Sequence, residues 1–426
     1  MPFAIRLAGS WEVHLRHFTH LSPAREAALF YRSPQEIGPS ADRLTQATAL
    51  GATLYAPGTR SDLASVARIQ GARGVTSMVF CLEDAVADDE LAMAELNVVS
   101  ALAELDGERS LPWIFVRIRN LAQLRRLLCG ASGASSALTG VVLPKFSAQS
   151  GAELLAEVAS ASERLGRQLW AMPVLESPEV IYNEGRTEAL LAIRSLVEAY
   201  PDVVLALRVG ATDLCGLYGL RRDRDHTIYD IAVVRDCLSA IVNVCARDAA
   251  QVVTGPVWEY FPSAERLFVS PLRVTPFEQA HEAELRTDLV SRDHDRLIRE
   301  VVLDKANGLL GKTVIHPSHV PAVHALMVVT HEEYTDARTV MDGDLGGVRR
   351  SDYGNKMNEL RPHRAWAEVV LRRATAFGVL RAGHSFVDVL AAQIESEPLR
   401  VDGAAAAGAL GSASGPLART LANRLG

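Results

Sequence analysis

Short apolar runs alternate with segments of helical pattern from residue 52 to about residue 320, and this alternation constrains the fold more than any other feature. The runs are rich in branched and aromatic residues, and most of them end at a polar side chain. The expected strands are ATLYAP (52–57), SMVFCLED (77–84), WIFVRIR (113–119), GVVLPK (140–145), LWAMPVLES (169–177), VVLALRVGATD (203–213), QVVTGP (251–256) and KTVIHP (312–317). Eight strand-helix units predict an α/β fold that closes as a (β/α)8 TIM barrel, rather than an open doubly wound sheet.

Helices are expected between these strands, near 61–71, 88–105, 150–165, 187–199, 228–248 and 280–307, and from about Ser318. The alternation divides the chain into four parts. We expect an N-terminal extension over 1–50, the barrel over 51–335, a C-terminal helical segment over 336–400 with a helix from Pro362 to Leu380, and a flexible tail over 401–426. The tail is biased toward Ala, Gly and Ser, which cannot bury a core.

The composition excludes several classes of partner. A hydrophobic content of 48% supports a large core, and a net charge of -7 gives no basic face for nucleic acid. No apolar run approaches the roughly 20 residues of a membrane span, and the first residues lack the apolar core of a signal peptide. The five cysteines form no CxxC pair, so we expect a cytoplasmic protein that acts on a small molecule.

Two of the predicted strands end at a carboxylate, Glu176 after MPVL and Asp213 after LRVGAT. The carboxyl ends of neighbouring parallel strands meet on one rim of a barrel, so these acids predict a site for a hard cation. Mg²⁺, or Mn²⁺ in its place, prefers oxygen ligands and keeps waters or substrate oxygens, so two carboxylates suffice. The alternative is that both acids only cap the helices that follow, and these two segments alone leave it open.

Further polar residues lie at the other strand ends, which predicts a shared site on that rim. They are Arg60, Glu83, Asp84, Arg117, Arg119, Lys145 and His316. Side chains alternate along a strand, so Glu83 and Asp84 cannot both point inward unless the strand has already ended. The same alternation predicts Arg117 and Arg119 on one face, where a guanidinium can grip a carboxylate through two bonds. Taken singly, each residue is equally explained by a structural ion pair.

Two other patterns suggest sites that we do not expect. His14, His17 and His20 are three residues apart and would share a helical face as metal ligands, but no Cys or acid joins them at ligand spacing. A packed or solvated face is the simpler interpretation. Residues 306–313, ANGLLGKT, satisfy a relaxed phosphate-loop pattern, but here a helix precedes the segment and a strand follows it. A phosphate loop has the reverse order, so nucleotide binding is not expected.

Several segments resemble one known family. LYAPGTR, FCLEDAV, VRIRN, VVLPK, PVLES, GATDL and GLLGKTVIHPSHV occur in order from about residue 52 to 320. This series resembles the citrate lyase β-subunit branch of the HpcH/HpaI aldolase superfamily. The N-terminal extension and YGNKMNELRPHRAWA (353–367) most resemble its C-C bond lyase group associated with tellurium-resistance gene clusters.

The resemblance implies a TIM barrel and a Mg-dependent lyase. The acids matching Glu176 and Asp213 bind the metal, and the arginine matching Arg117 binds substrate. Cleavage of a bond β to a carbonyl leaves an enolate, which a divalent ion stabilises while Glu83 or Asp84 relays a proton. Arg60 and Lys145 would complete the substrate-binding set. A Schiff base on Lys145 is the less favoured alternative, because neighbouring acids keep the amine protonated.

The resemblance also implies a homo-oligomer, a trimer or a multiple of it, and a coenzyme A thioester as a candidate substrate. In the family a GKMxD segment carries an aspartate into a neighbouring subunit's site. Here GNKMNE places Glu359 nearest to that position, with Asn358 and His363 as other candidates.

Three functions therefore follow for this chain. The first is cleavage of a β-hydroxy acid or a β-hydroxyacyl thioester by a metal-dependent lyase. The alternatives are a thioester hydrolase on the same scaffold and a catalytically inactive binding subunit. The intact set of Glu176, Asp213 and Arg117 argues against the inactive subunit.

Overall fold

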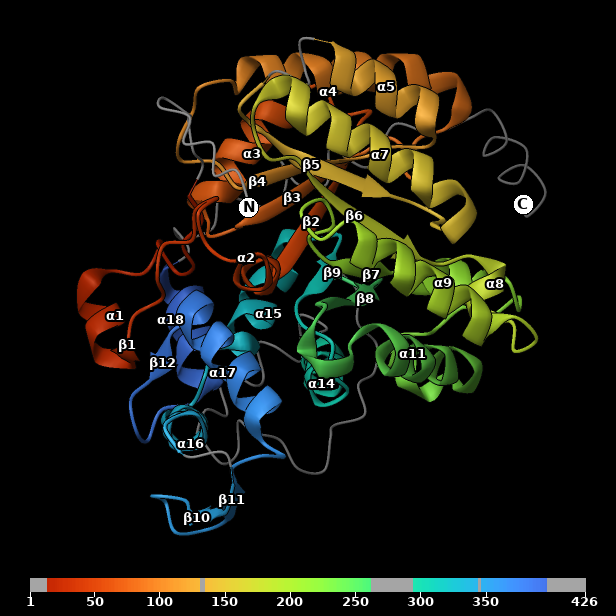
Figure 1. Ribbon diagram of the computed structural model, residues 1–426. Coiled ribbons are helices and arrows are strands. Elements are labelled where there is room, and N and C mark those ends of the chain that lie inside the picture. The colour runs from red at the N-terminus through yellow and green to blue at the C-terminus, as the bar shows by residue number, and fades with distance from the viewer. Residues whose placement is uncertain (1–13, 131–134, 262–293, 344–345, 397–426) are drawn as a thin grey trace, which may run out of the picture.

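The computed structural model of the 426-residue chain describes residues 14–130, 135–261, 294–343 and 346–396. Its centre is a closed barrel of eight parallel strands that pair in chain order, ringed by helices (Figure 1). The strands are β2 (Ala52–Pro57), β3 (Ser77–Cys81), β4 (Trp113–Arg117), β5 (Leu138–Leu143), β6 (Trp170–Leu175), β7 (Leu207–Val209), β8 (Val253–Trp258) and β9 (Lys312–Val314). Each expected strand is present, and the predicted TIM barrel is confirmed.

The strands are apolar because both of their faces are covered. Every residue of β3 and β6 is buried, one set of side chains inside the barrel and the other against the helices. Arg208 of β7 shows which side chains point inward, since its guanidinium contacts Thr53 of β2 and Thr313 of β9 across the barrel. The barrel interior is therefore partly polar at this level.

The surrounding helices follow the expected positions, with one addition. They are α3 (Leu63–Ala72), α4 (Leu91–Glu104), α5 (Leu121–Cys129), α7 (Ala148–Leu165), α9 (Arg186–Ala199), α11 (Ala232–Cys245), α14 (His294–Ala306) and α15 (Val320–Met327). Helix α5 was not predicted, although Asn120 caps it and Leu124, Leu127 and Leu128 face the core. The expected helix over 280–307 is described only as α14, and residues 280–293 lie outside the described residues. Because α14 precedes β9 there, the order expected for residues 306–313 is confirmed.

The segments before and after the barrel pack against each other. The first contains α1 (Pro23–Leu29), β1 (Phe30–Arg32) and α2 (Arg43–Ala49). The second contains α16 (His331–Met341), β10 (Val348–Arg350), β11 (Met357–Glu359), α17 (Arg364–Phe377), β12 (Val379–Leu380) and α18 (Phe386–Ser396). Strand β1 pairs antiparallel with β12, and both segments lie on the same side of the barrel in Figure 1. The predicted tail, 401–426, lies outside the described residues.

The three N-terminal histidines do not share a helical face, because residues 14–20 form turns rather than a helix. His17 is fully buried, donates or accepts one hydrogen bond with the carbonyl of Ala49, and stacks on Phe377 at a centroid distance of 4.1 Å. Burial lowers the pKa of His17 to about 3, so the ring is neutral. His14 instead pairs with Glu36 at 3.5 Å. The packed interpretation holds for His17.

A buried ionic network joins α14 to β9. Nζ of Lys312 donates to Oε1 of Glu300 at 2.8 Å and to Oδ2 of Asp304 at 2.7 Å, and all three side chains are 0% exposed. The hydroxyl of Tyr229 donates to the other oxygen of Asp304 at 2.8 Å. The network fixes the last barrel strand to its preceding helix. Within the described residues, no helix combines the length and apolar character needed to cross a bilayer.

Candidate active site

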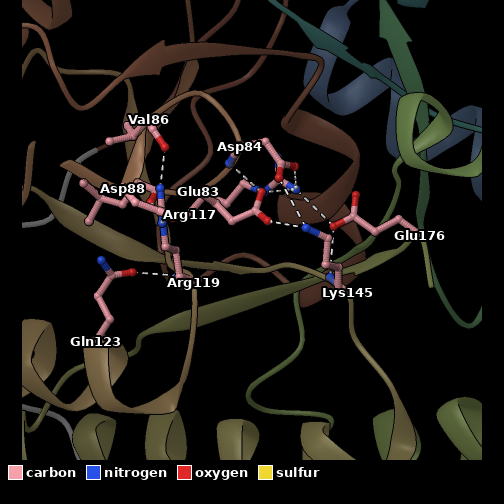
Figure 2. Close-up of polar contacts among 10 residues, drawn as sticks. Glu83, Asp84, Val86, Asp88, Arg117, Arg119, Gln123, Lys145 and Glu176 are labelled. Carbon is pink, nitrogen blue, oxygen red and sulfur yellow. Dashed lines mark hydrogen bonds and ion pairs between the residues drawn. The ribbon is translucent and has the colours of Figure 1, made fainter. Parts of the chain in front are cut away.

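The polar cluster lies at the carboxyl ends of β3 to β6, on one rim of the barrel (Figure 2). Strand β3 ends at Cys81, so Glu83 and Asp84 follow it in a turn where the alternation of a strand no longer applies. Both acids therefore reach the same cation. Nζ of Lys145 donates to Oε1 of Glu83 at 2.7 Å and to Oδ1 of Asp84 at 3.2 Å.

Arg117, the last residue of β4, lies at the centre of this cluster. Its Nη2 atom lies 2.8 Å from Oε2 of Glu83, 3.1 Å from Oδ2 of Asp84 and 3.0 Å from Oε1 of Glu176. The side chain is 12% exposed. Burial opposes the charge of the guanidinium, but Glu176 and the other nearby groups raise the pKa of Arg117 overall. The residue is a fixed cation at the floor of the rim.

Glu176 follows β6 and divides its two oxygens between different neighbours. Oε1 accepts from Nη2 of Arg117 and, at 2.9 Å, from the backbone nitrogen of Lys145. Lys145 adopts φ 46°, a left-handed conformation, in the turn after β5. Oε2 faces Gly210, where an added Cβ atom would lie only 1.9 Å from it. Ser177 rather than Glu176 occupies the cap position of the next helix, α8 (Pro178–Ile181), so the capping interpretation of Glu176 is wrong.

Asp213 lies in the first turn of α10 (Ala211–Gly216), beside Glu176. Burial and then the charge of Asp84 raise the pKa of Asp213, whose carboxyl interacts with that of Glu176. Burial raises the pKa of Glu176 to about 7, and Asp213 adds to the shift while Arg117 opposes it. Two carboxyl groups that each raise the pKa of the other are relieved by a divalent cation between them.

This donor set fits a magnesium ion. Glu176 has one oxygen that neither Arg117 nor Lys145 uses, and Asp213 supplies a second carboxylate at the same place. Over the described residues, His, Cys, Asp and Glu side chains form no group of three or more suited to a metal. Mg²⁺ does not need a third protein ligand, because it retains waters or takes substrate oxygens.

Lys145 is held as an ammonium ion. Its hydrogen bond to Glu83 is the largest of several effects that raise the pKa of the amine. A Schiff base needs a neutral amine at working pH, and this environment opposes it. The geometry therefore favours Lys145 as a cation that binds rather than as a nucleophile.

Arg119 corrects one expectation. The alternation of a strand predicts that it shares a face with Arg117, but β4 ends at Arg117 and the chain turns. The Arg119 side chain points away from the cluster and donates to the carbonyl oxygens of Leu82, at 2.8 Å, and Val86, and to Asp88 (Figure 2). It braces the loop after β3.

Other predicted residues lie apart from the cluster in their described contacts. Arg60 follows β2 and binds Asp62 through two bonds, of 2.9 Å and 2.7 Å. His316 follows β9, accepts from the hydroxyl or the backbone of Ser318, and stacks on Phe261 at 5.0 Å. Glu359 lies on the β10–β11 hairpin, away from the barrel in Figure 1. The side chain of Asn358 is buried and donates to Asp336, so it is not available as an acid.

One residue of the rim was missed from the sequence. Tyr55 of β2 points into the barrel and interacts electrostatically with Arg117, Cys81 and Glu176. The alternation of β2 contains the signal, because Thr53 and Tyr55 share a face. An aromatic residue in a buried strand is normally assigned to the core, which hid it.

The comparisons with solved structures agree with this fold. A citrate lyase from Burkholderia xenovorans has 20% identity, covers 80% of this chain and 96% of its own, and gives a TM-score of 0.54. The CitE protein from Mycobacterium tuberculosis in complex with magnesium, acetoacetate and coenzyme A has 22% identity, covers 76% and 97%, and gives a TM-score of 0.46. The citrate lyase β subunit from M. tuberculosis complexed with oxaloacetate and magnesium has 22% identity, covers 65% and 96%, and gives 0.40.

Among proteins with curated descriptions, none matches the chain. The model of one protein family, described as C-C bond lyase of the TIM-Barrel fold, matches residues 44–379. That range spans the whole barrel, each residue of the polar cluster and the C-terminal helix α17. The chain therefore belongs to the C-C bond lyase family of the TIM-barrel fold.

Proposed function

We propose that this chain is a Mg-dependent lyase that cleaves the C-C bond β to a carbonyl in a β-hydroxy acid or a β-hydroxyacyl thioester. The observation that carries the proposal is the pair of buried carboxyl groups, Glu176 and Asp213, facing the cations Arg117 and Lys145 on one barrel rim. Mn²⁺ is expected to replace Mg²⁺, since both accept oxygen ligands.

The residues divide the chemistry among them. Oε2 of Glu176 and the carboxylate of Asp213 would hold the ion, which supplies Lewis-acid polarisation of the substrate's carbonyl and carboxylate oxygens. Arg117 would stabilise the negative charge that develops on the carbonyl oxygen as the bond breaks. Lys145 and Arg60 would bind the substrate's carboxylate or acyl group, Lys145 through an ammonium that already lies within the cluster.

The two acids after β3 differ in exposure. The Glu83 side chain is 8% exposed and is held by Arg117, Lys145 and the backbone nitrogen of Asp84. The Asp84 side chain is 49% exposed. We therefore assign proton relay from the substrate hydroxyl to Asp84, and orientation of Lys145 and Arg117 to Glu83.

The test is a product assay with purified protein, Mg²⁺, and a panel of β-hydroxy acids and their coenzyme A thioesters. A lyase releases an oxo compound and an acid or thioester, whereas the alternative, thioester hydrolysis, releases free thiol with the carbon skeleton intact. An inactive binding subunit would bind panel members in calorimetry without converting any of them. Either of these two results would overturn the lyase assignment.

We also propose that the protein forms a homo-oligomer, a trimer or a multiple of it. The β10–β11 hairpin stands away from the barrel (Figure 1) and exposes Val348, Tyr353 and Met357, which are 54%, 44% and 57% accessible. Glu359 on this hairpin would act as an acid in a neighbouring subunit's site, a role for which His363 is the other candidate. Light scattering that gives a 46.1 kDa monomer at micromolar concentration would remove both ideas.

A further inference from the structure

The side chain of Tyr55 lies in the interior of a closed barrel, yet it is only partly buried. A residue inside a filled barrel becomes accessible only where it borders the open mouth. Its electrostatic neighbours are Arg117 of β4, Glu176 after β6 and Cys81 of β3, so the phenol group lies at the floor of the polar cluster. Tyr55 thus borders the proposed site from the strand opposite those that carry the acids.

The ring of Tyr55 rests on a buried cation. The guanidinium carbon of Arg208 lies 5.6 Å from the ring centroid, and the Arg208 residue is 1% exposed. Arg208 donates to Thr313 Oγ1 at 2.6 Å and to Thr53 Oγ1 at 3.3 Å. These bonds fix the guanidinium under the ring, so the direction of the phenol is set from below.

Among the described residues, the Tyr55 hydroxyl has no hydrogen-bond partner in the protein, whereas the other polar groups around it are paired. Arg117 and Lys145 both bond to the surrounding acids. Burial raises the pKa of the Tyr55 phenol, so the group keeps its proton and can donate. A fixed, protonated donor that faces a site and has no protein partner is suited to bind an oxygen of a ligand.

We infer that Tyr55 is a further substrate-contacting residue, whose hydroxyl donates a hydrogen bond to a carbonyl or carboxylate oxygen of an oxo acid seated on Arg117. The inference rests on the proposed function. Arg208 is its positioning residue, because it holds the ring without reaching the rim. The ligand class is an acyclic oxo acid with at least two oxygens, one for the Arg117 side and one for the phenol.

The experiment compares the full-length parent, Tyr55→Phe and the matched control Tyr31→Phe, which removes a hydroxyl from a residue that is 53% exposed on β1. Calorimetry measures Mg²⁺ binding first, and then oxaloacetate binding at saturating Mg²⁺. We expect Tyr55→Phe to bind Mg²⁺ like the parent and oxaloacetate about ten- to a hundredfold more weakly, with Tyr31→Phe unchanged in both.

The other outcomes separate this inference from the proposed function. If Tyr55→Phe binds Mg²⁺ and oxaloacetate as tightly as the parent, Tyr55 contacts no substrate, and the lyase proposal stands. If Tyr55→Phe loses Mg²⁺ affinity as well, its role is structural and the inference is wrong. If the parent itself binds Mg²⁺ but not oxaloacetate, the ligand class of both proposals is wrong.

Discussion

Nη2 of Arg117 lies 3.0 Å from Oε1 of Glu176, and the backbone nitrogen of Lys145 lies 2.9 Å from the same oxygen. Both donors use one oxygen of the carboxylate, which turns the other toward Gly210 and Asp213. The cation that is proposed to act on the substrate thus also orients the proposed metal ligand. Arg117 and Glu176 are expected to behave as one unit in mutagenesis.

Gly210→Ala should abolish tight Mg²⁺ binding. Its φ of -97° suits alanine, so the effect would come from contact alone, because the new Cβ would lie 1.9 Å from Oε2 of Glu176 and 2.6 Å from its Cβ. Gly216→Ala is the matched control, since nothing lies within 4 Å of a Cβ there. Calorimetric titration of both variants checks the prediction. Equal affinity in Gly210→Ala and Gly216→Ala would show that Oε2 of Glu176 is not a ligand.

The affinity for Mg²⁺ should fall as the pH falls through about 7. The pKa of Glu176 is raised to about 7 in the metal-free protein, so below that pH the carboxyl must lose a proton before it binds the ion. Affinity should weaken by up to about tenfold per pH unit below this value and level off above it. Titrations at pH 8, 7 and 6, in buffers of different ionisation heat, measure both affinity and released protons. A flat profile without proton release would rule out this role for Glu176.

The barrel was predictable from the sequence because both faces of each strand are buried, as in SMVFC of β3, so the strands read as continuous apolar runs. The acids at the strand ends were predictable for the same reason, since a carboxylate interrupts such a run abruptly. Arg119 was misplaced because the end of β4 at Arg117 has no turn residue to mark it. Strand alternation therefore predicted a shared face where the chain had already turned.

Tyr55 and the packing of the two extensions were not predictable in the same way. The sequence shows that Thr53 and Tyr55 share a face but not that Arg208, far along the chain, lies beneath that ring. Likewise, the pairing of β1 with β12 joins segments more than 300 residues apart by a few backbone bonds, which leave no periodic signal. Long-range contacts of single side chains decide both features.

Arg117→Lys should lower turnover by about 10²- to 10³-fold at equal metal occupancy, because an ammonium group cannot reproduce the contacts of the guanidinium fork. The same cluster offers a control of identical chemistry in Arg119→Lys. Arg119 donates to the loop after β3 rather than to the acids, so that variant should retain turnover within a few-fold. Steady-state kinetics on a cleaved substrate measures both. Collapse in Arg119→Lys with near-parental turnover in Arg117→Lys would mean that the roles are reversed.

Lys312→Met should destabilise the fold without touching the site. It leaves Glu300 and Asp304, both 0% exposed, without the ammonium group that bridges them. Breaking such a buried pair costs about 3–5 kcal/mol. Arg338→Met removes an exposed pair with Asp342 at 3.0 Å and should cost under about 1 kcal/mol. Urea unfolding compares the two variants, and equal stability would show that the network contributes little.

The most direct test of the proposed lyase site is calorimetric titration of Mg²⁺ into the parent protein and Asp213→Asn at pH 8. Asp213→Asn keeps the shape of the side chain but removes one of the two charges proposed to hold the ion. We predict that the parent binds one Mg²⁺ per chain and that Asp213→Asn binds at least tenfold more weakly, with the same fold by circular dichroism. Equal Mg²⁺ affinity in the two proteins would contradict the assignment of the site to Glu176 and Asp213.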